Sequence, residues 1–201
     1  MSEWMVISFL KIRKHCPGIS SKMTINYGIY LLISTVVTCV LFWSKGTQFT
    51  GILYGVAGAM LVSLSVVDWN TRYIPFEWNV IIFLCGLIRI FADFSNWLEY
   101  VIGLFAVSGF LFLVDRISVP LLKKRYSGMD MEIDHAIGDG DIKLMAATGL
   151  LIGWKLNLLA LAIGCIAGSV IHLGLMMIKK GERQLALGPY LSLGVLSTMI
   201  C

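Results

Sequence analysis

Long apolar stretches separated by short polar segments dominate this chain. A helix needs about 20 apolar residues to cross the roughly 30 Å hydrocarbon core of a membrane. Helices are expected rather than strands, because an open sheet edge in lipid leaves backbone groups unpaired. The pattern therefore predicts an all-α, polytopic membrane helix bundle with about six to seven transmembrane helices. The candidate stretches are 27–43, 51–67, 78–92, 97–114, 142–154, 156–178 and 185–200.

Composition supports a membrane protein and suggests a simple organisation. Of the 201 residues, 58% are hydrophobic and 14% are charged, whereas soluble domains carry roughly a quarter charged residues. We expect a cytoplasmic or interfacial segment over 1–25 and one membrane-embedded domain over 26–201. Residues 3–14 could form an interfacial helix or a disordered basic tail. No cleavable signal peptide is expected, because the basic residues follow the first short apolar run.

The charge distribution predicts how the chain is oriented. The net charge is +4. If the N-terminus is cytoplasmic, twelve Lys and Arg residues lie in cytoplasmic segments, whereas only Lys45 and Lys155 lie in exterior loops. Cytoplasmic loops of membrane proteins carry such an excess of basic residues. A predicted cytoplasmic loop over 115–140 is either a solvated connector or a mobile flap over a site.

Several classes of site are not supported by the sequence. The basic residues border apolar stretches and form no patch interleaved with aromatic residues, so no nucleic-acid partner is expected. The five cysteines include no Cys-x-x-Cys pair, and we expect neither a metal nor a cofactor.

Two aspartates stand at the borders of apolar stretches. Asp68 follows the stretch 51–67, and Asp141 precedes the stretch 142–154. A carboxylate is costly to desolvate at a membrane boundary, so such residues point to a functional site. Two carboxylates that meet can activate a water molecule against a peptide bond. The alternatives are that Asp68 simply ends a helix and that Asp141 is an ordinary helix cap.

Asp141 closes the glycine-rich sequence Gly138-Asp139-Gly140-Asp141. The two glycines allow unusual backbone conformations and the close approach of a substrate chain. In an extended loop Asp139 and Asp141 would point the same way, so either could be the second acid. Lys143 could extend to the membrane interface or pair with a carboxylate.

Two prolines mark further backbone irregularities near the same side of the membrane. Pro75 disfavours helix for the residue before it, so we expect 69–75 to be partly extended. Gly188 and Pro189 interrupt the start of the last stretch. The backbone groups freed there could pair with an extended substrate, or the sequence could be a structural kink.

Together these elements resemble the type IV prepilin peptidase family of bacterial membrane aspartic proteases. The resemblance implies that Asp68 and Asp141 form the catalytic pair and that Asp139 occupies a variable position. The sequence departs from the family pattern in one respect. Many members carry a Cys-x-x-Cys insert that is associated with N-methylation, and this sequence has no such pair, so methyltransferase activity is not expected. The matching segments are Asp68 with Ile74-Pro75, residues 138–144 and residues 188–191.

The resemblance implies an activity and a location. Members cut short basic leaders from pilin-like precursors at the cytoplasmic face of the bacterial inner membrane. The partners would be prepilin-like substrates and the lipid bilayer, and the oligomeric state is not predicted. Basic leaders would be attracted to the acidic residues Asp130, Glu132 and Asp134. Residues expected to shape the site or bind substrate are Gly138, Gly140, Lys143, Pro75, Gly188 and Pro189.

The helix dipoles suggest which acid holds the proton. Asp68 follows a helix C-terminus, which disfavours its ionised form, and Asp141 meets a helix N-terminus, which favours it. We therefore predict that Asp68 holds the proton and that Asp141 is the base. Two other functions remain open at this point: a non-catalytic protein such as a proton-coupled transporter, and a Gly-x-Gly-Asp peptidase that cuts within transmembrane segments.

Overall fold

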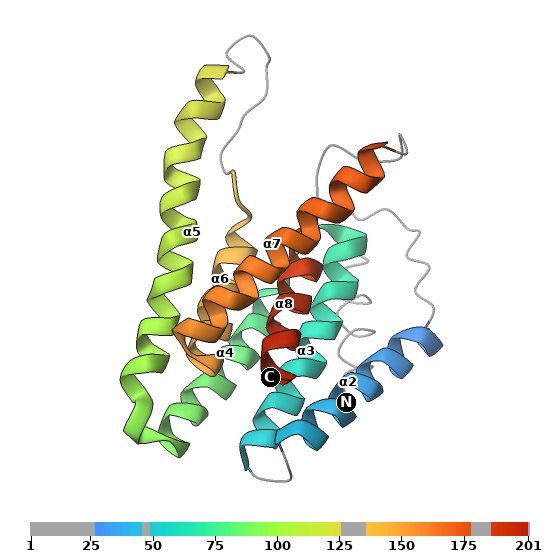
Figure 1. Cartoon of the computed structure of the whole chain (residues 1–201), viewed down its shortest axis with the longest axis vertical. Coiled ribbons are helices and arrows are strands. Elements are labelled where there is room, and N and C mark those ends of the chain that lie inside the picture. The colour runs from blue at the N-terminus through green and yellow to red at the C-terminus, as the bar shows by residue number, and fades with distance from the viewer. Residues whose placement is uncertain (1–26, 46–48, 126–135, 178–185, 201) are drawn as a thin grey trace.

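A computed structural model describes residues 27–45, 49–125, 136–177 and 186–200 of the chain (Figure 1). The predicted interfacial helix over 3–14 and the three acids at 130, 132 and 134 lie outside these residues. Within the described ranges, every regular element is a helix, which confirms the predicted fold class.

Each apolar stretch predicted from the sequence corresponds to one α-helix, although the ends differ. Three segments, Phe49–Trp69, Phe94–Lys123 and Trp154–Gly174, are long and apolar enough to cross a membrane. The elements are α2 (Tyr27–Lys45), α3 (Phe49–Thr71), α4 (Phe76–Ala92), the short 3-10 helix η1 (Phe94–Asn96), α5 (Trp97–Arg125), α6 (Asp139–Ile152), α7 (Trp154–Met177) and α8 (Gly188–Ile200).

Helix α3 is the most buried of the three candidate membrane spans. It packs against α2, α4 and α8, while α6 packs against α4, α5 and α7. Leu64 of α3, Leu144 of α6 and Leu191 of α8 are fully buried. In contrast, α5 and α7 carry large exposed apolar side chains such as Phe105 and Ile166. A helix that is apolar on all sides is suited to a lipid environment, so these outer faces are the surface that lipid would cover.

Helices α5 and α6 cross at two glycines. A Cβ atom placed on Gly103 would collide with the carbonyl oxygen of Gly149, and the reverse also holds. Small residues let helix backbones approach closely in membranes. The same device brings Gly194 of α8 against the carbonyl of Ala160 in α7.

Two helices are longer than the sequence predicted. Helix α5 continues to Arg125, with Pro120 inside it, so residues 115–125 do not belong to a loop as we expected. Helix α3 continues to Thr71, where the backbone N–H of Arg72 donates to the carbonyl of Asp68 at 2.8 Å. The extended segment before Pro75 is therefore shorter than the predicted 69–75.

Three helix ends gather on one side of the bundle. Figure 1 shows the C-terminal end of α3 and the N-terminal ends of α6 and α8 in the upper part of the molecule, beneath the far end of α5. Asp68, Asp141 and Gly188 lie at these three ends.

Candidate active site

Asp68 connects the end of α3 to the Gly188-Pro189 pair at the start of α8. It lies one turn before the end of α3 and is only 5% exposed. Its Oδ2 atom accepts a hydrogen bond of 3.0 Å from the backbone N–H of Gly188, the first residue of α8. A hydrogen bond to the charged form and a nearby helix N-terminus both stabilise a negative charge on a carboxylate.

Gly188 makes this contact possible because it has no side chain. A Cβ atom at this position would lie 2.6 Å from Oδ2 of Asp68. Pro189 follows inside the first turn of α8, where a missing N–H costs nothing. The Gly-Pro pair therefore begins the last helix rather than kinking it, and the described helix starts later than the predicted stretch 185–200.

Ile74 connects the Asp68 segment to the glycine-rich motif. Pro75 is the N-cap of α4, with φ −62° and ψ 128°, so the chain is extended there as expected. A Cβ atom on Gly140 would lie 2.8 Å from the Cβ of Ile74, and one on Gly188 would lie 3.3 Å from its Cδ1. The Ile74 side chain thus lies between Gly140 of the glycine-rich sequence and Gly188 at the start of α8.

Asp141 lies in the first turn of α6, outside the three candidate membrane spans. Gly138 is the N-cap of this helix, and its carbonyl accepts the backbone N–H of Asp141 at 3.0 Å. The Asp141 side chain is 8% exposed, and among the described residues its Oδ1 atom has no hydrogen-bond partner. Burial, and to a smaller extent the charge of Asp68, raise the pKa of Asp141 to about 7.

These surroundings favour the opposite proton assignment from the one predicted by the helix dipoles. The end of α3 disfavours a charge on Asp68, but the N–H of Gly188 and the start of α8 offset that effect. Asp141 has a favourable helix N-terminus, yet its burial, with an Oδ1 atom that no described group binds, disfavours the charged form. The geometry supports an ionised Asp68 beside a protonated Asp141.

Two other charged residues of the motif lie outside the buried pair. Asp139 is the first residue of α6 and is exposed. Of the two acids that the sequence left open, only Asp141 is therefore buried near Asp68. Lys143 is also exposed, and its Nζ atom lies 5.9 Å from the centre of the Phe76 ring.

Two buried polar residues near the site were missed in the sequence. Asn79 in the first turn of α4 places its Nδ2 atom 3.5 Å from the carbonyl oxygen of Gly140. Asp115 in α5 accepts two backbone N–H groups just before Gly138. Both residues lie at the edge of a predicted apolar stretch. The position of a polar residue at such an edge, which identified Asp68, could therefore have identified them as well.

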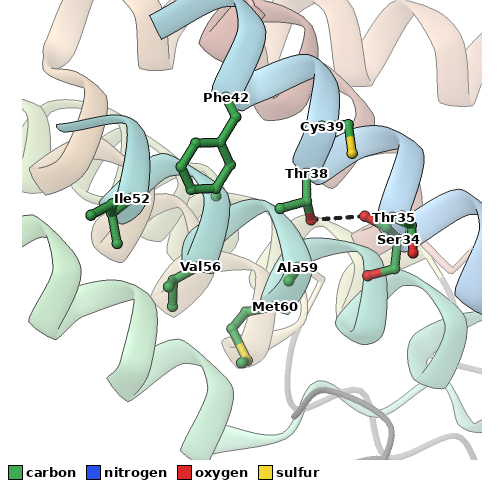
Figure 2. Close-up of a pocket in the computed structure, with 10 residues that line it drawn as sticks. Ser34, Thr35, Thr38, Cys39, Phe42, Ile52, Val56, Ala59 and Met60 are labelled. Carbon is green, nitrogen blue, oxygen red and sulfur yellow. Dashed lines mark hydrogen bonds between the residues drawn. The ribbon is translucent and has the colours of Figure 1, made fainter. Parts of the chain in front are cut away.

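The structure also contains an open groove away from the carboxylates. Its volume is about 390 Å³, and it runs between α2 and the N-terminal half of α3 (Figure 2). Its lining includes the apolar side chains of Phe42, Ile52, Val56 and Met60. The hydroxyl of Thr38, another lining residue, donates a hydrogen bond of 2.8 Å to the carbonyl of Ser34. No carboxylate lines the groove, so it does not provide the chemistry of the Asp68 site.

Comparisons with known proteins identify relatives over most of the chain. The sequence model of the Type IV leader peptidase family matches residues 55–173. This chain is 27% and 28% identical to proteins named "Prepilin leader peptidase/N-methyltransferase" from Burkholderia pseudomallei (strain 1026b) and Neisseria gonorrhoeae, respectively. These alignments cover 96% and 93% of this chain but only 60% and 62% of the relatives. No solved structure matches the chain.

Proposed function

Because the chain belongs to the Type IV leader peptidase family, we propose that it is a membrane aspartic endopeptidase that removes the leader from prepilin-like precursors. Asp68 and Asp141 are the proposed catalytic pair. The observation that carries this proposal is the burial of both carboxylates at one end of the bundle, where Gly188 binds Asp68 and the charge of Asp68 acts on Asp141. The substrate class comes from the name of the relatives.

The pair would share one proton between two carboxylates. Ionised Asp68 takes a proton from a water molecule, and the resulting hydroxyl attacks the scissile carbonyl carbon. Protonated Asp141 gives its proton to the carbonyl oxygen, which produces a neutral tetrahedral intermediate. As this intermediate collapses, Asp141 takes a proton back from its hydroxyl and Asp68 protonates the leaving amine. The C–N bond breaks, and both acids return to their starting states.

The glycines of the site would shape the space around the pair. Gly140 and Gly188 have no room for a side chain against Ile74 and Asp68, so substitution there would move the catalytic groups. Gly138, Pro75 and Pro189 set the starts of α6, α4 and α8. Lys143 stands at the exposed edge of this region, where it would contact substrate or lipid headgroups rather than the reacting atoms.

We place the site at the cytoplasmic face of a bacterial inner membrane. The excess of Lys and Arg on the cytoplasmic side of the predicted topology supports this placement. Lys155, one of the two basic residues assigned to the exterior, follows the end of α6 that is remote from Asp141. The N-methyltransferase part of the relatives' name is not part of the proposal, because the matched family describes a leader peptidase.

The test is cleavage of a prepilin-like precursor by the purified protein in liposomes. Asp68→Asn and Asp141→Asn should each lower the rate by at least about 100-fold, because neither amide can carry the required proton. Asp139→Asn is the matched control: it removes a carboxylate two residues from Asp141 that is exposed, and its rate should stay within about threefold of the unsubstituted protein. Full activity of either buried-acid variant, or loss confined to Asp139→Asn, would refute the assignment.

A further inference from the structure

Asp115 is a buried carboxylate that the proposed reaction does not use. It lies in α5 and is 3% exposed. Its Oδ1 atom accepts the backbone N–H groups of Ala136 at 2.6 Å and of Ile137 at 2.9 Å. Hydrogen bonds to a charged acceptor are roughly twice as strong as those between neutral groups. One side chain of α5 therefore holds two consecutive residues that are more than twenty positions away in the sequence.

These two residues lead directly into the glycine-rich motif. Ile137 precedes Gly138, the N-cap of α6, and the N-cap residue makes no side-chain hydrogen bond to this helix. The carbonyl of Gly138 accepts the N–H groups of Asp141 at 3.0 Å and of Ile142 at 3.3 Å. The backbone between Ile137 and Asp141 is thus a short hydrogen-bonded turn, and a shift at its beginning would be transmitted to the Asp141 side chain.

A second contact fixes the other end of α6 against α5. Gly149 of α6 crosses Gly103 of α5 so closely that neither position has space for a side chain. Asp115 lies twelve positions after Gly103 in α5, and Gly149 lies twelve positions after Ile137. At about 1.5 Å of rise per helical residue, the two intervals have nearly equal lengths. The glycine crossing and the Asp115 contact therefore fix α6 to α5 near both of its ends.

We propose that Asp115 is a positioning residue that holds the start of α6 against α5, so that Asp141 reaches Asp68. This inference rests on the proposed function, because its catalytic consequence requires Asp141 to react. Removing the carboxylate leaves the N–H groups of the exposed Ala136 and the half-buried Ile137 without their acceptor, so the start of α6 loses this hold on its position. A misplacement of a catalytic group by about 1 Å can lower a rate on the order of 100-fold.

The first test compares Asp115→Ala with Asp115→Asn in the precursor-cleavage assay. The alanine variant should lower kcat by about 10- to 100-fold with KM changed less than about threefold, because the substrate-binding surface remains while Asp141 is displaced. The asparagine variant keeps an oxygen that can accept both N–H groups. It should recover kcat to within about fivefold of the unsubstituted protein.

The second test measures amide hydrogen exchange in the peptide that contains Ala136 and Ile137. Exchange there should become at least about tenfold faster in Asp115→Ala and stay near that of the unsubstituted protein in Asp115→Asn. This readout does not depend on enzymatic activity. It therefore distinguishes a failure of the anchoring contact from a failure of the proposed peptidase function.

Asn157→Ala provides a control for general destabilisation. Asn157 is fully buried in α7; its Nδ2 atom donates to the carbonyl of Met145 at 2.8 Å, and its Oδ1 atom accepts the hydroxyl of Thr148 at 3.0 Å. Its loss should lower the thermal midpoint while leaving exchange at residues 136–137 and kcat within about twofold. If kcat and amide exchange at residues 136–137 change only in Asp115→Ala, the cause is then the displaced start of α6 rather than a general loss of stability.

Each outcome decides the proposal. Wild-type kcat or unchanged exchange in folded Asp115→Ala would overturn it. If the alanine variant does not accumulate, the asparagine variant decides. Slow amide exchange at residues 136–137 together with near-normal kcat in Asp115→Asn would support the contact. Slow exchange together with a kcat reduced more than tenfold would contradict the positioning role of the contact. If exchange responds as expected but Asp68→Asn and Asp141→Asn remain active, the anchor stands and the peptidase proposal fails.

Discussion

At the scale of single residues, two chemically identical side chains acquire different surroundings. Asp68 accepts an N–H from Gly188, whereas Asp141 is buried with an oxygen that finds no partner among the described residues. The difference comes from neighbours far away in the sequence. These neighbours favour the proton assignment opposite to the one that the helix dipoles predict, and which acid holds the proton stays a prediction.

Gly188→Ala should disrupt the site without disrupting the bundle. The added methyl group would lie 2.6 Å from Oδ2 of Asp68, so the carboxylate must move and lose its hydrogen bond. We expect precursor cleavage to fall by at least about tenfold while the thermal midpoint changes little. Gly174→Ala is the control, because nothing lies within 4 Å of a Cβ atom there. Equal activity of the two variants would contradict the close contact between α8 and Asp68.

Asp141 should make stability and activity depend on pH near neutrality. Its pKa rises from 3.8 to about 7 on folding, so the folded protein binds a proton more tightly than the unfolded chain. Stability is then lost as pH rises from about 4 to 7. Asp141→Asn removes this cost and should stabilise the protein at pH 8 by up to about 4 kcal/mol, with little difference near pH 4.

Thermal melting in detergent at several pH values measures this effect. In the active protein, the rate should also decline above about pH 7, because Asp141 then loses the proton that it donates. A stabilising effect that is the same at pH 4 and pH 8 would show that Asp141 is not the titrating group.

At the scale of helices, close glycine packing sets where the catalytic elements lie. The crossing of Gly103 and Gly149 joins the longest helix, α5, to the helix that carries Asp141. Because lipid tails are as apolar as leucine, such contacts depend on backbone approach rather than on the exclusion of water.

Gly149→Ala should destabilise the bundle strongly. Its methyl group would meet the carbonyl of Gly103 in a neighbouring backbone, which cannot rotate away. We expect a loss of about 2–3 kcal/mol, or a protein that fails to accumulate. Gly109→Ala, in open space on α5, should be neutral or stabilising by about 0.5–1 kcal/mol through helix propensity. Thermal midpoints in the same detergent compare the two variants, and equal midpoints would contradict the tight crossing.

At the scale of the whole molecule, both acids lie near helix ends on the same side of the bundle. Asp68 is in the last turn of α3, and Asp141 is in the first turn of α6. A proton-coupled transporter would be better served by acids midway along its membrane spans. The placement favours a site that opens at a membrane surface, where a precursor could deliver its leader.

Cysteine labelling in spheroplasts should establish which surface this is. Lys155→Cys should react with a membrane-impermeant maleimide added outside, because its side chain is 68% exposed at the end of the bundle assigned to the exterior. Glu77→Cys, at the exposed start of α4 near Pro75, should react only after permeabilisation. The unsubstituted protein reports background labelling of its own cysteines. The reverse pattern would place the carboxylates outside the cytoplasm.

The apolar pattern alone determined the helical architecture, because a chain in lipid must satisfy its backbone groups within each segment. The motifs around Asp68, Asp141 and Gly188 were likewise visible as residues, and the family match confirms the resemblance they suggested. Their catalytic roles stay predictions. The ends of α3 and α5 could not be placed from the sequence, because polar residues near a helix end do not show where the helix stops.

Only the tertiary structure decided which groups meet. Hydropathy records how each segment partitions between water and lipid, but it contains no information about which helix faces which. The hydrogen bond from Gly188 to Asp68 and the hydrogen bonds from residues 136–137 to Asp115 join segments that are distant in the sequence. Such contacts determine the surroundings and the position of the two acids, and they exist only once the helices have packed.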